Sequence, residues 1–272
     1  MDIGFDLASS ERAVSDAALL PWCYAAVGVH PHDTKTMTEE IYEKIRRLAG
    51  QPKVQAIGEI GLDFYYNHSD AEDQRYWFRR QIRLANELHM PIVIHAREAD
   101  QETMDILKEE GAFSEERCGW FPPRPGTGIG RKTGAQTTQK ASRAGEGGQA
   151  EACDCTENCC MEKDARVLLH CFSGSRELAE QYVKLGATIS IAGPVTYKNN
   201  RKTSEVVSAI PIEYLLVETD APYLTPEPHR GKKNQSPYVA YTARRVALLK
   251  GISYEEAARR TLENAKRFYG ID

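Results

Sequence analysis

Residues 54–66 read VQAIGEIGLDFYY, a short apolar run that is interrupted by one carboxylate. Val54, Ala56 and Ile57 predict a buried strand, yet Glu59 follows at a point where a core strand rarely carries a charge. Burying an unpaired carboxylate costs several kcal/mol or forces it to take up a proton. The stretch therefore predicts a strand of a buried sheet, in which Glu59 is paired with a group from elsewhere in the chain.

Similar apolar runs recur along the chain, and most of them are apolar at consecutive positions. This pattern is typical of parallel strands that are buried on both faces. We expect strands over residues 22–29, 54–59, 91–95, 166–170, 187–191 and 214–220, with residues 1–6 as the remnant of another.

Amphipathic helical patterns separate these runs. Three of them follow a Ser or Thr that stands three residues before a Glu, a spacing typical of a capping box. The three pairs are Thr36 with Glu39, Ser69 with Glu72, and Ser253 with Glu256. The apolar residues expected to face inward are Ile41, Ile45 and Leu48 in the first helix, Trp77, Phe78, Ile82, Ala85 and Leu88 in the second, and Ala257, Leu262 and Ala265 in the third.

The alternation of strands and helices predicts a parallel α/β fold. An open doubly wound sheet and a TIM-type (β/α)8 barrel both fit about seven strands. No GxGxxG motif follows a strand, which disfavours a nucleotide-binding open sheet. The segment GTGIGRKTG at 126–134 lacks the spacing of a phosphate-binding loop and has no strand before it.

Composition and charge exclude several classes of protein. The chain has 272 residues, of which 41% are hydrophobic and 27% charged, and its net charge is −4. This charge argues against a non-specific basic nucleic-acid binder, but not against an enzyme that meets phosphate through bound metal. No secretory signal and no apolar stretch of about 18 residues is found, so we expect a cytoplasmic protein without a membrane span.

Residues 112–165 interrupt the alternation of strands and helices. They are rich in Gly, Pro, Ser, Thr and basic residues, and we expect a flexible inserted segment. The rest of the chain, 1–111 and 166–272, would form a single α/β domain. The insertion contains four close cysteines, for which metal binding and a reduced, mobile tract are both open: Cys153, Cys155, Cys159 and Cys160.

Four of the predicted strands end on a possible metal ligand: Glu59, His95, His170 and Asp220. The carboxyl ends of parallel strands share one face of the sheet, so these side chains are expected to converge. Imidazole combined with carboxylate suits Zn, Mn, Fe or Co, and Mg is also considered. Two carboxylates allow one of them to bridge two ions, and two ions can act together on a phosphodiester. The pattern predicts that Glu59 is paired with metal.

Several motifs in the same order resemble the TatD family of metal-dependent deoxyribonucleases. The resemblance extends over residues 1–111 and 166–272 and implies a (β/α)8 barrel that binds a divalent metal pair and hydrolyses phosphodiester bonds in DNA. The motifs are AVGVHPH (26–32), IGEIGLDFYY (57–66), PIVIHAR (91–97), LLHCFSGS (168–175) and LLVETDAPYL (215–224).

The resemblance also implies roles for individual residues. Glu59 would bridge the two ions, and His95 and His170 would hold one of them. Asp220 would hold the other ion and handle the proton of the attacking water. His30 resembles a family residue that meets substrate phosphate. Apart from the resemblance, Arg97 either meets phosphate or pairs with a loop carboxylate, and the basic loop at 226–234 either attracts a DNA backbone or is an ordinary solvated loop.

The chain departs from the family pattern at its start. The family begins with a strand that carries an Asp-x-His-x-His motif, whereas this sequence begins with what resembles the second strand. We therefore expect a barrel that lacks the first β/α unit and has two exposed edges. His30 and His32 have the same spacing as the missing histidines, but they lie in the loop of the third strand and are not expected to replace them. A truncated gene model, a fragment and an impaired protein all remain open.

Three functions follow from these patterns. The first is a TatD-like DNase, whose activity the missing histidines would impair. The second is an amidohydrolase-type deacylase or lactonase that acts on a small molecule; that class commonly bridges its metals with a carboxylated lysine, and Glu59 disfavours it. The third is a catalytically inactive interaction protein. The insertion follows a helix and so should lie at the amino-terminal face of the barrel, away from the metals.

Overall fold

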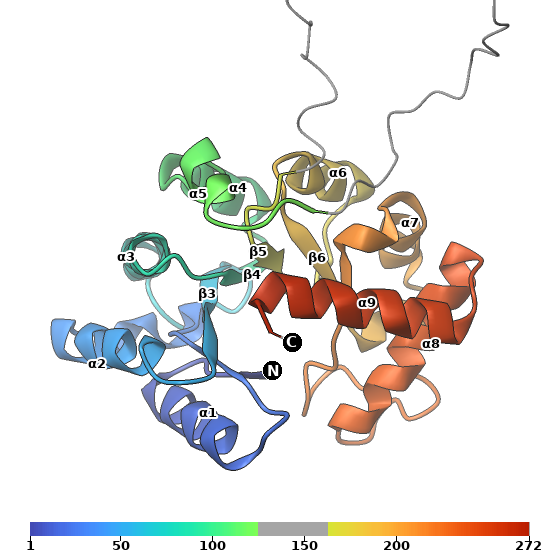
Figure 1. Cartoon of the computed structure of the whole chain (residues 1–272), viewed down its shortest axis with the longest axis horizontal. Coiled ribbons are helices and arrows are strands. Elements are labelled where there is room, and N and C mark those ends of the chain that lie inside the picture. The colour runs from blue at the N-terminus through green and yellow to red at the C-terminus, as the bar shows by residue number, and fades with distance from the viewer. Residues whose placement is uncertain (125–162, 272) are drawn as a thin grey trace, which may run out of the picture.

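The computed structural model describes residues 1–124 and 163–271. Seven parallel strands lie in chain order from β1 to β7 and form one curled sheet with helices around its outside (Figure 1). In the described part of the chain β1 does not pair with β7, so the sheet curls without closing. The prediction of a TIM-type barrel without one β/α unit is confirmed. The strands are Asp2–Ile3, Ala25–Val27, Val54–Asp63, Ile92–Arg97, Val167–Leu169, Thr188–Ile191 and Leu215–Val217.

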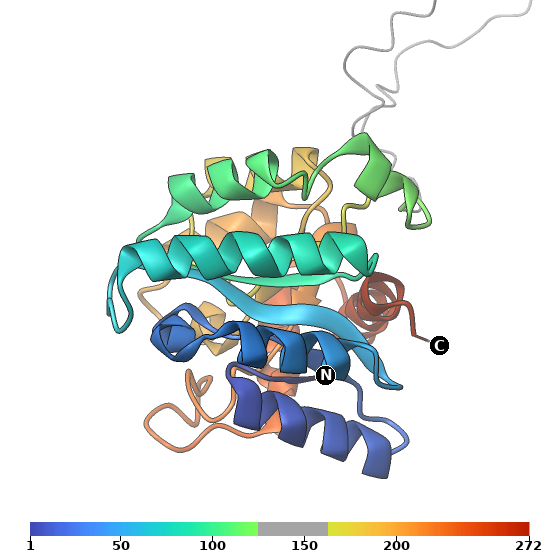
Figure 2. The same ribbon diagram turned by 90° about the vertical axis from the view of Figure 1, so that its left-hand side faces the viewer.

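A helix follows each strand and packs on the outer face of the sheet. Figure 2 shows the helices of the amino-terminal half as successive layers along one side of the molecule. The α-helices α1 to α9 are Leu7–Leu19, Glu39–Ala49, Ala71–Glu87, Asp100–Glu109, Glu115–Gly119, Arg176–Lys184, Arg201–Ala209, Val239–Lys250 and Tyr254–Tyr269, and short 3-10 helices lie at Pro31–Thr36 (η1), Gly193–Thr196 (η3), Ile212–Tyr214 (η4) and Ser236–Tyr238 (η5). Among the described residues, no helix is long and apolar enough to cross a membrane.

Only one of the three predicted caps is correct. Ser253 caps α9 and accepts a hydrogen bond from the backbone N–H of Glu256. The cap of α2 is Thr38 rather than Thr36, because Thr36 is still part of η1. Ser69 does not cap α3, because its hydroxyl is used in a tertiary contact and donates to the carbonyl of His32. Spacing alone does not distinguish a cap from a neighbouring polar residue.

Alternation along the strands divides the core into an outer and an inner layer. Ile92 and Ile94 of β4 pack against the surrounding helices, whereas Val93 between them points into the curl. Leu168 and Leu216 point inward in the same way. The inner layer is completed by Phe268 and Tyr269 from the end of α9, which in Figure 1 lies across the sheet with its end near the amino terminus.

Two leucines, one in α9 and one at the end of α3, are more exposed than the sequence predicted. Leu262 is 57% exposed and Leu88 is 36% exposed, although both were expected to face inward. Leu88 is the residue that caps the end of α3 and so lies beyond its last turn. Of the other residues predicted to be inward in these two helices, Ala265 is half-buried and the rest are buried: Trp77, Phe78, Ile82, Ala85 and Ala257.

The structure describes only the two ends of the predicted insertion, residues 112–124 and 163–165. These ends are packed into the fold. Arg117 of α5 is fully buried and donates to the carbonyls of Ala165 and Met90. Arg124 forms a buried ion pair with Asp164 and donates to the hydroxyl of Thr188 at the start of β6. Both ends therefore lie at the amino-terminal ends of the strands; the four clustered cysteines lie outside the described residues, and the division into barrel and insertion stays a prediction.

Candidate metal centre

A β-bulge directs Glu59 into the curl of the sheet. Pairing between β3 and β4 shifts register between Ile57 and Ile60, so that both of these residues face the outer layer. An extra residue in a strand reverses the alternation beyond it, and this turns Glu59 inward. Glu59 thus lies within β3, which runs on to Asp63, and the prediction that the strand ends on Glu59 was wrong.

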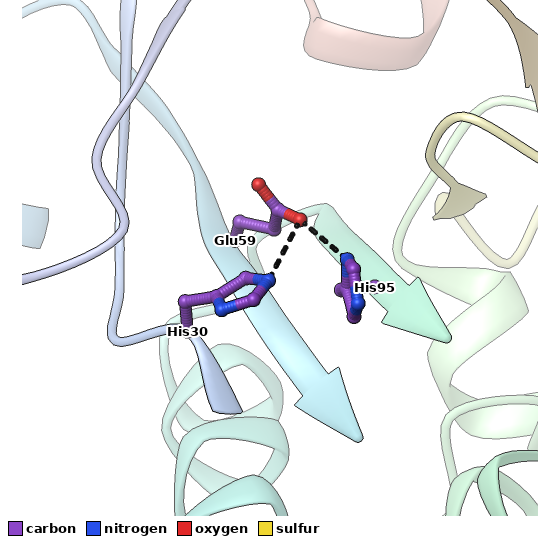
Figure 3. A group of neighbouring side chains, drawn as sticks. All are labelled: His30, Glu59 and His95. Atoms are coloured by element: carbon purple, nitrogen blue, oxygen red, sulfur yellow. Dashed lines mark hydrogen bonds and ion pairs between the residues drawn. The ribbon is translucent and has the colours of Figure 1, made fainter. Parts of the chain in front are cut away.

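Three imidazoles surround the carboxylate of Glu59. Its Oε1 lies 3.0 Å from Nδ1 of His95 and 3.4 Å from Nε2 of both His30 and His170. His95 lies in β4, His170 directly follows β5, and His30 directly precedes η1. Figure 3 shows His30 and His95 pointing at the same oxygen. The sequence alone could not show that the groups paired with Glu59 include His30.

The distances around Glu59 fit a shared cation. Ligand atoms that bind one ion at about 2.1 Å in a tetrahedral arrangement are about 3.4 Å apart. The separations between Glu59 and the three histidines are close to this value. Donor atoms of His30, Glu59 and His95 all lie within 4.8 Å of one another. Imidazole and carboxylate donors at such distances are typical of ligands to a divalent ion of the transition series, and the proton on each imidazole decides which of them can bind it.

The hydrogen bond made by the ring nitrogen that faces away from Glu59 indicates which imidazoles suit a metal ion. Nε2 of His95 lies 3.0 Å from Asp63, and Nδ1 of His170 lies 2.8 Å from Glu218. Donation to these carboxylates leaves the nitrogen that faces Glu59 with a lone pair. Nδ1 of His30 instead accepts from the backbone N–H of His32, at 3.2 Å. Neutral His30 therefore carries its proton on Nε2, where it can donate to an anion but cannot ligate a cation.

Asp63 and Glu218 were not among the site residues predicted from the sequence. Asp63 is fully buried and lies within hydrogen-bond distance of both His95 and His32. It also accepts from the backbone N–H groups of Tyr65 and Tyr66. A signal for it was present, because a buried carboxylate four residues after Glu59 needs a partner just as Glu59 does.

Asp220 reaches the same site from the loop after β7. Its Oδ1 lies 3.9 Å from Nε2 of His170, and its backbone adopts a left-handed conformation with φ of 55°. Burial, together with the neighbouring Glu218 and Glu59, raises the pKa of Asp220 to about 6 against the opposing effects of His170 and His95. A carboxylate with this pKa can accept and release a proton close to neutral pH.

The charges of the site favour a cation beside Glu59. Burial raises the pKa of Glu59, but His170, His30 and His95 outweigh burial, and the net pKa lies well below its ordinary value. Burial lowers the pKa of His170, but Glu218 and Glu59 reverse this and raise it well above its ordinary value. For His30 burial prevails and the pKa is lowered. The carboxylate is therefore ionised and attracts positive charge, which a metal ion can supply in place of the proton on His170.

Arg97 lies two residues beyond His95 on the same face of β4. Its guanidinium lies 4.0 Å from the ring centre of Tyr65 and 4.5 Å from that of Tyr66. Within residues 1–124 and 163–271 it forms no ion pair with a carboxylate. Of the six predicted site residues, the structure thus gathers Glu59, His95, His170 and His30 around one oxygen, with Asp220 beside His170 and Arg97 beside the site.

A curled parallel sheet with histidines and carboxylates toward the carboxyl ends of its strands is typical of barrel metallohydrolases. The family model described as "TatD related DNase" matches residues 1–119 and 146–270. The chain belongs to the TatD family of metal-dependent hydrolases. The match extends into both ends of the predicted insertion and leaves residues 120–145 unmatched.

Individual relatives agree with this assignment. The chain is 38% identical over 270 residues to an uncharacterized metal-dependent hydrolase, YabD, of Bacillus subtilis, covering 99% of this chain and 86% of the relative. It is 31% identical over 274 residues to a protein of Erwinia tasmaniensis named 3′-5′ ssDNA/RNA exonuclease TatD, covering 98% and 86%. The crystal structure of YjjV, a TatD homologue from Escherichia coli, superposes with a TM-score of 0.75 at 23% identity and covers 99% of this chain and 85% of that one, which shows the shared fold.

Proposed function

We propose that the chain is a phosphodiester hydrolase that cleaves DNA with a divalent metal pair. The observation that carries this proposal is the carboxylate of Glu59, which lies within 3.4 Å of ring nitrogens of both His95 and His170. The second hydrogen bonds of these two imidazoles leave a lone pair on the ring nitrogen that faces Glu59 in each of them. The name of the Erwinia relative supports nucleic acid as the substrate class.

Each residue then has a defined task. Glu59, His95 and His170 would hold one ion, and Glu59 with Asp220 would hold the other. When bound, the divalent ions would polarise the scissile phosphate and activate water. Asp220, with its raised pKa, takes the proton from the attacking water. His30 donates from Nε2 to a phosphate oxygen, and Arg97 binds a phosphate with its guanidinium.

The test removes the charge of Glu59 without changing its size. Glu59→Gln is expected to lower both the metal content of the purified protein and the rate at which it cleaves single-stranded DNA in Mn²⁺ at least a hundredfold. Glu116→Gln, on the exposed face of α5, is the matched control and should change neither. Elemental analysis and a gel assay measure the two quantities. Normal metal content and a normal rate in Glu59→Gln would exclude this site.

A further inference from the structure

Two tyrosines and Arg97 form an exposed surface directly beside the candidate metal centre. Tyr65 is 53% exposed and Tyr66 is 49% exposed, although both are large and partly apolar. The guanidinium of Arg97 lies over both rings. We call Tyr65, Tyr66 and Arg97 the tyrosine platform.

The tyrosine platform is held in a fixed conformation. Asp63 accepts the backbone N–H groups of both tyrosines, at 3.1 and 2.9 Å. The ring of Tyr66 stacks on His68 with an angle of 5° between their planes, and the edge of His32 meets it at a ring-centre distance of 5.5 Å. A ring that is ordered before binding loses little conformational entropy when a ligand stacks on it.

The register of the strands places the tyrosine platform next to the metal ligands. Gly61 pairs with His95 and Asp63 pairs with Arg97 in the β3–β4 ladder. Arg97 is thus one side-chain repeat, about 6.6 Å, from His95 along the same face of the strand. One nucleotide can span this separation, with its phosphate at the metal centre and its base on the tyrosine platform.

Nothing within the described residues neutralises Arg97, whose guanidinium is exposed and stacked rather than ion-paired. Exposed aromatic rings combined with arginine are characteristic of surfaces that bind single-stranded nucleic acid, because every base has a flat face that stacks without sequence preference. A base inside a duplex has both faces covered by its neighbours and cannot use such a surface.

We propose that the tyrosine platform is the base-binding part of this site, where it stacks against the base of an unpaired nucleotide. This inference rests on the proposed function, because it assigns the base-binding part of the same substrate site. Tyr65 and Tyr66 supply the stacking area, and Arg97 supplies the charge that holds the adjoining phosphate.

The experiment varies the protein and the ligand together. The ligands are a fluorescein-labelled thymidine tetranucleotide and an abasic tetranucleotide that keeps all phosphates and lacks the bases. Fluorescence anisotropy in EDTA measures binding without cleavage, and a second assay in Mn²⁺ measures cleavage. The variants are Tyr65→Ala with Tyr66→Ala, the same pair changed to Phe, and Tyr76→Ala as a control that is 50% exposed on α3.

We expect the unchanged protein to bind the ligand with bases about tenfold or more tightly than the abasic one. The double alanine variant should lose this preference and bind both ligands like the abasic one. The phenylalanine pair and Tyr76→Ala should keep it. Circular dichroism confirms that each variant is folded.

Three results would overturn the inference. A preference for bases that survives in the double alanine variant, or no preference in the unchanged protein, refutes the role of the tyrosines while leaving the proposed function intact. If neither ligand is bound and neither is cleaved by the unchanged protein, the proposed function fails and the inference fails with it.

Discussion

Asp63 connects more parts of the site than any other single residue described above. Its carboxylate lies within 3.0 Å of ring nitrogens of His95 and His32 and also accepts two backbone N–H groups. Burial raises the pKa of Asp63, but hydrogen bonds from His95, Tyr66 and His32 lower it further than burial raises it. The group is therefore ionised and fixes the ring orientation of His95 toward Glu59.

Asp63→Asn should weaken divalent metal binding about tenfold or more. Oδ2 of Asp63 holds both imidazoles and Oδ1 accepts both backbone N–H groups, and an amide NH2 in place of either oxygen cannot accept, so the ring of His95 loses its orientation. Isothermal titration with Mn²⁺ measures the change. Asp73→Asn, on the exposed side of α3, is the control and should bind as before. Equal affinity in Asp63→Asn and the unchanged protein would show that Asp63 does not orient His95.

Most of the predicted site residues follow from the sequence because each stands at or near the end of an apolar run. The carboxylates that bind the other ring nitrogens of these histidines could not be predicted, because Asp63 and His95 are 32 residues apart and His170 and Glu218 are 48 apart. No local pattern encodes these pairings. The bulge that turns Glu59 inward is hidden for the same reason, since it exists only in the pairing of β3 with β4.

At the scale of elements, α3 and α4 are joined by charge as well as by apolar contact. Glu110, at the end of α4, accepts from Arg79 at 2.9 Å and from Arg83 at 2.6 Å, and its side chain is only 8% exposed. Burial raises the pKa of Glu110, but the two arginines outweigh burial and the net pKa is lowered. The ionised carboxylate therefore stabilises the folded state.

Glu110→Gln should lower the free energy of unfolding by about 1 kcal/mol at pH 7, a value discounted for the exposure of Arg83. Because the folded pKa is lowered, this stabilisation is fully present above the ordinary value of 4.5 and is lost as the pH falls through the folded pKa. Urea titrations at pH 7 and pH 3 measure both. Glu109→Gln, 58% exposed, should have little effect. A loss of the same size at pH 3 would contradict an ionic origin.

The elements themselves were largely predictable, and their boundaries were not. All seven strands lie within or overlap the expected apolar runs, because buried parallel strands need apolar residues on both faces. Thr36 and Ser69 have the spacing of caps, but a 3-10 turn and a tertiary hydrogen bond engage them instead. Such competition is decided by three-dimensional contacts that a local pattern does not contain.

At the scale of the whole molecule, the interior of the curl depends on α9. Phe268 is fully buried and packs with Val93, Leu168 and Leu216 from three different strands. His95, a candidate metal ligand, stands two residues after Val93 in β4, and its side chain therefore points to the same face of the strand. The apolar layer thus lies directly beneath the site. The same helix that fills the interior therefore supports the candidate metal centre.

Phe268→Ala should lower the free energy of unfolding by about 3–5 kcal/mol, because it removes a buried ring and leaves a cavity among the strands. Leu262→Ala, on the exposed side of the same helix, should change it by no more than about 0.5 kcal/mol. Chemical denaturation followed by circular dichroism measures both. Similar losses for the two variants would show that the position of α9 has been misassigned.

The place of α9 in the chain order has a consequence for biosynthesis. Ribosomes make proteins from the amino terminus, so all seven strands leave the exit tunnel before Phe268 and Tyr269 have been added. During that interval Val93, Leu168 and Leu216 have no helix to cover them, and the nascent chain exposes the apolar surface that chaperones bind. The inner apolar layer can be covered only after α9 has been synthesised.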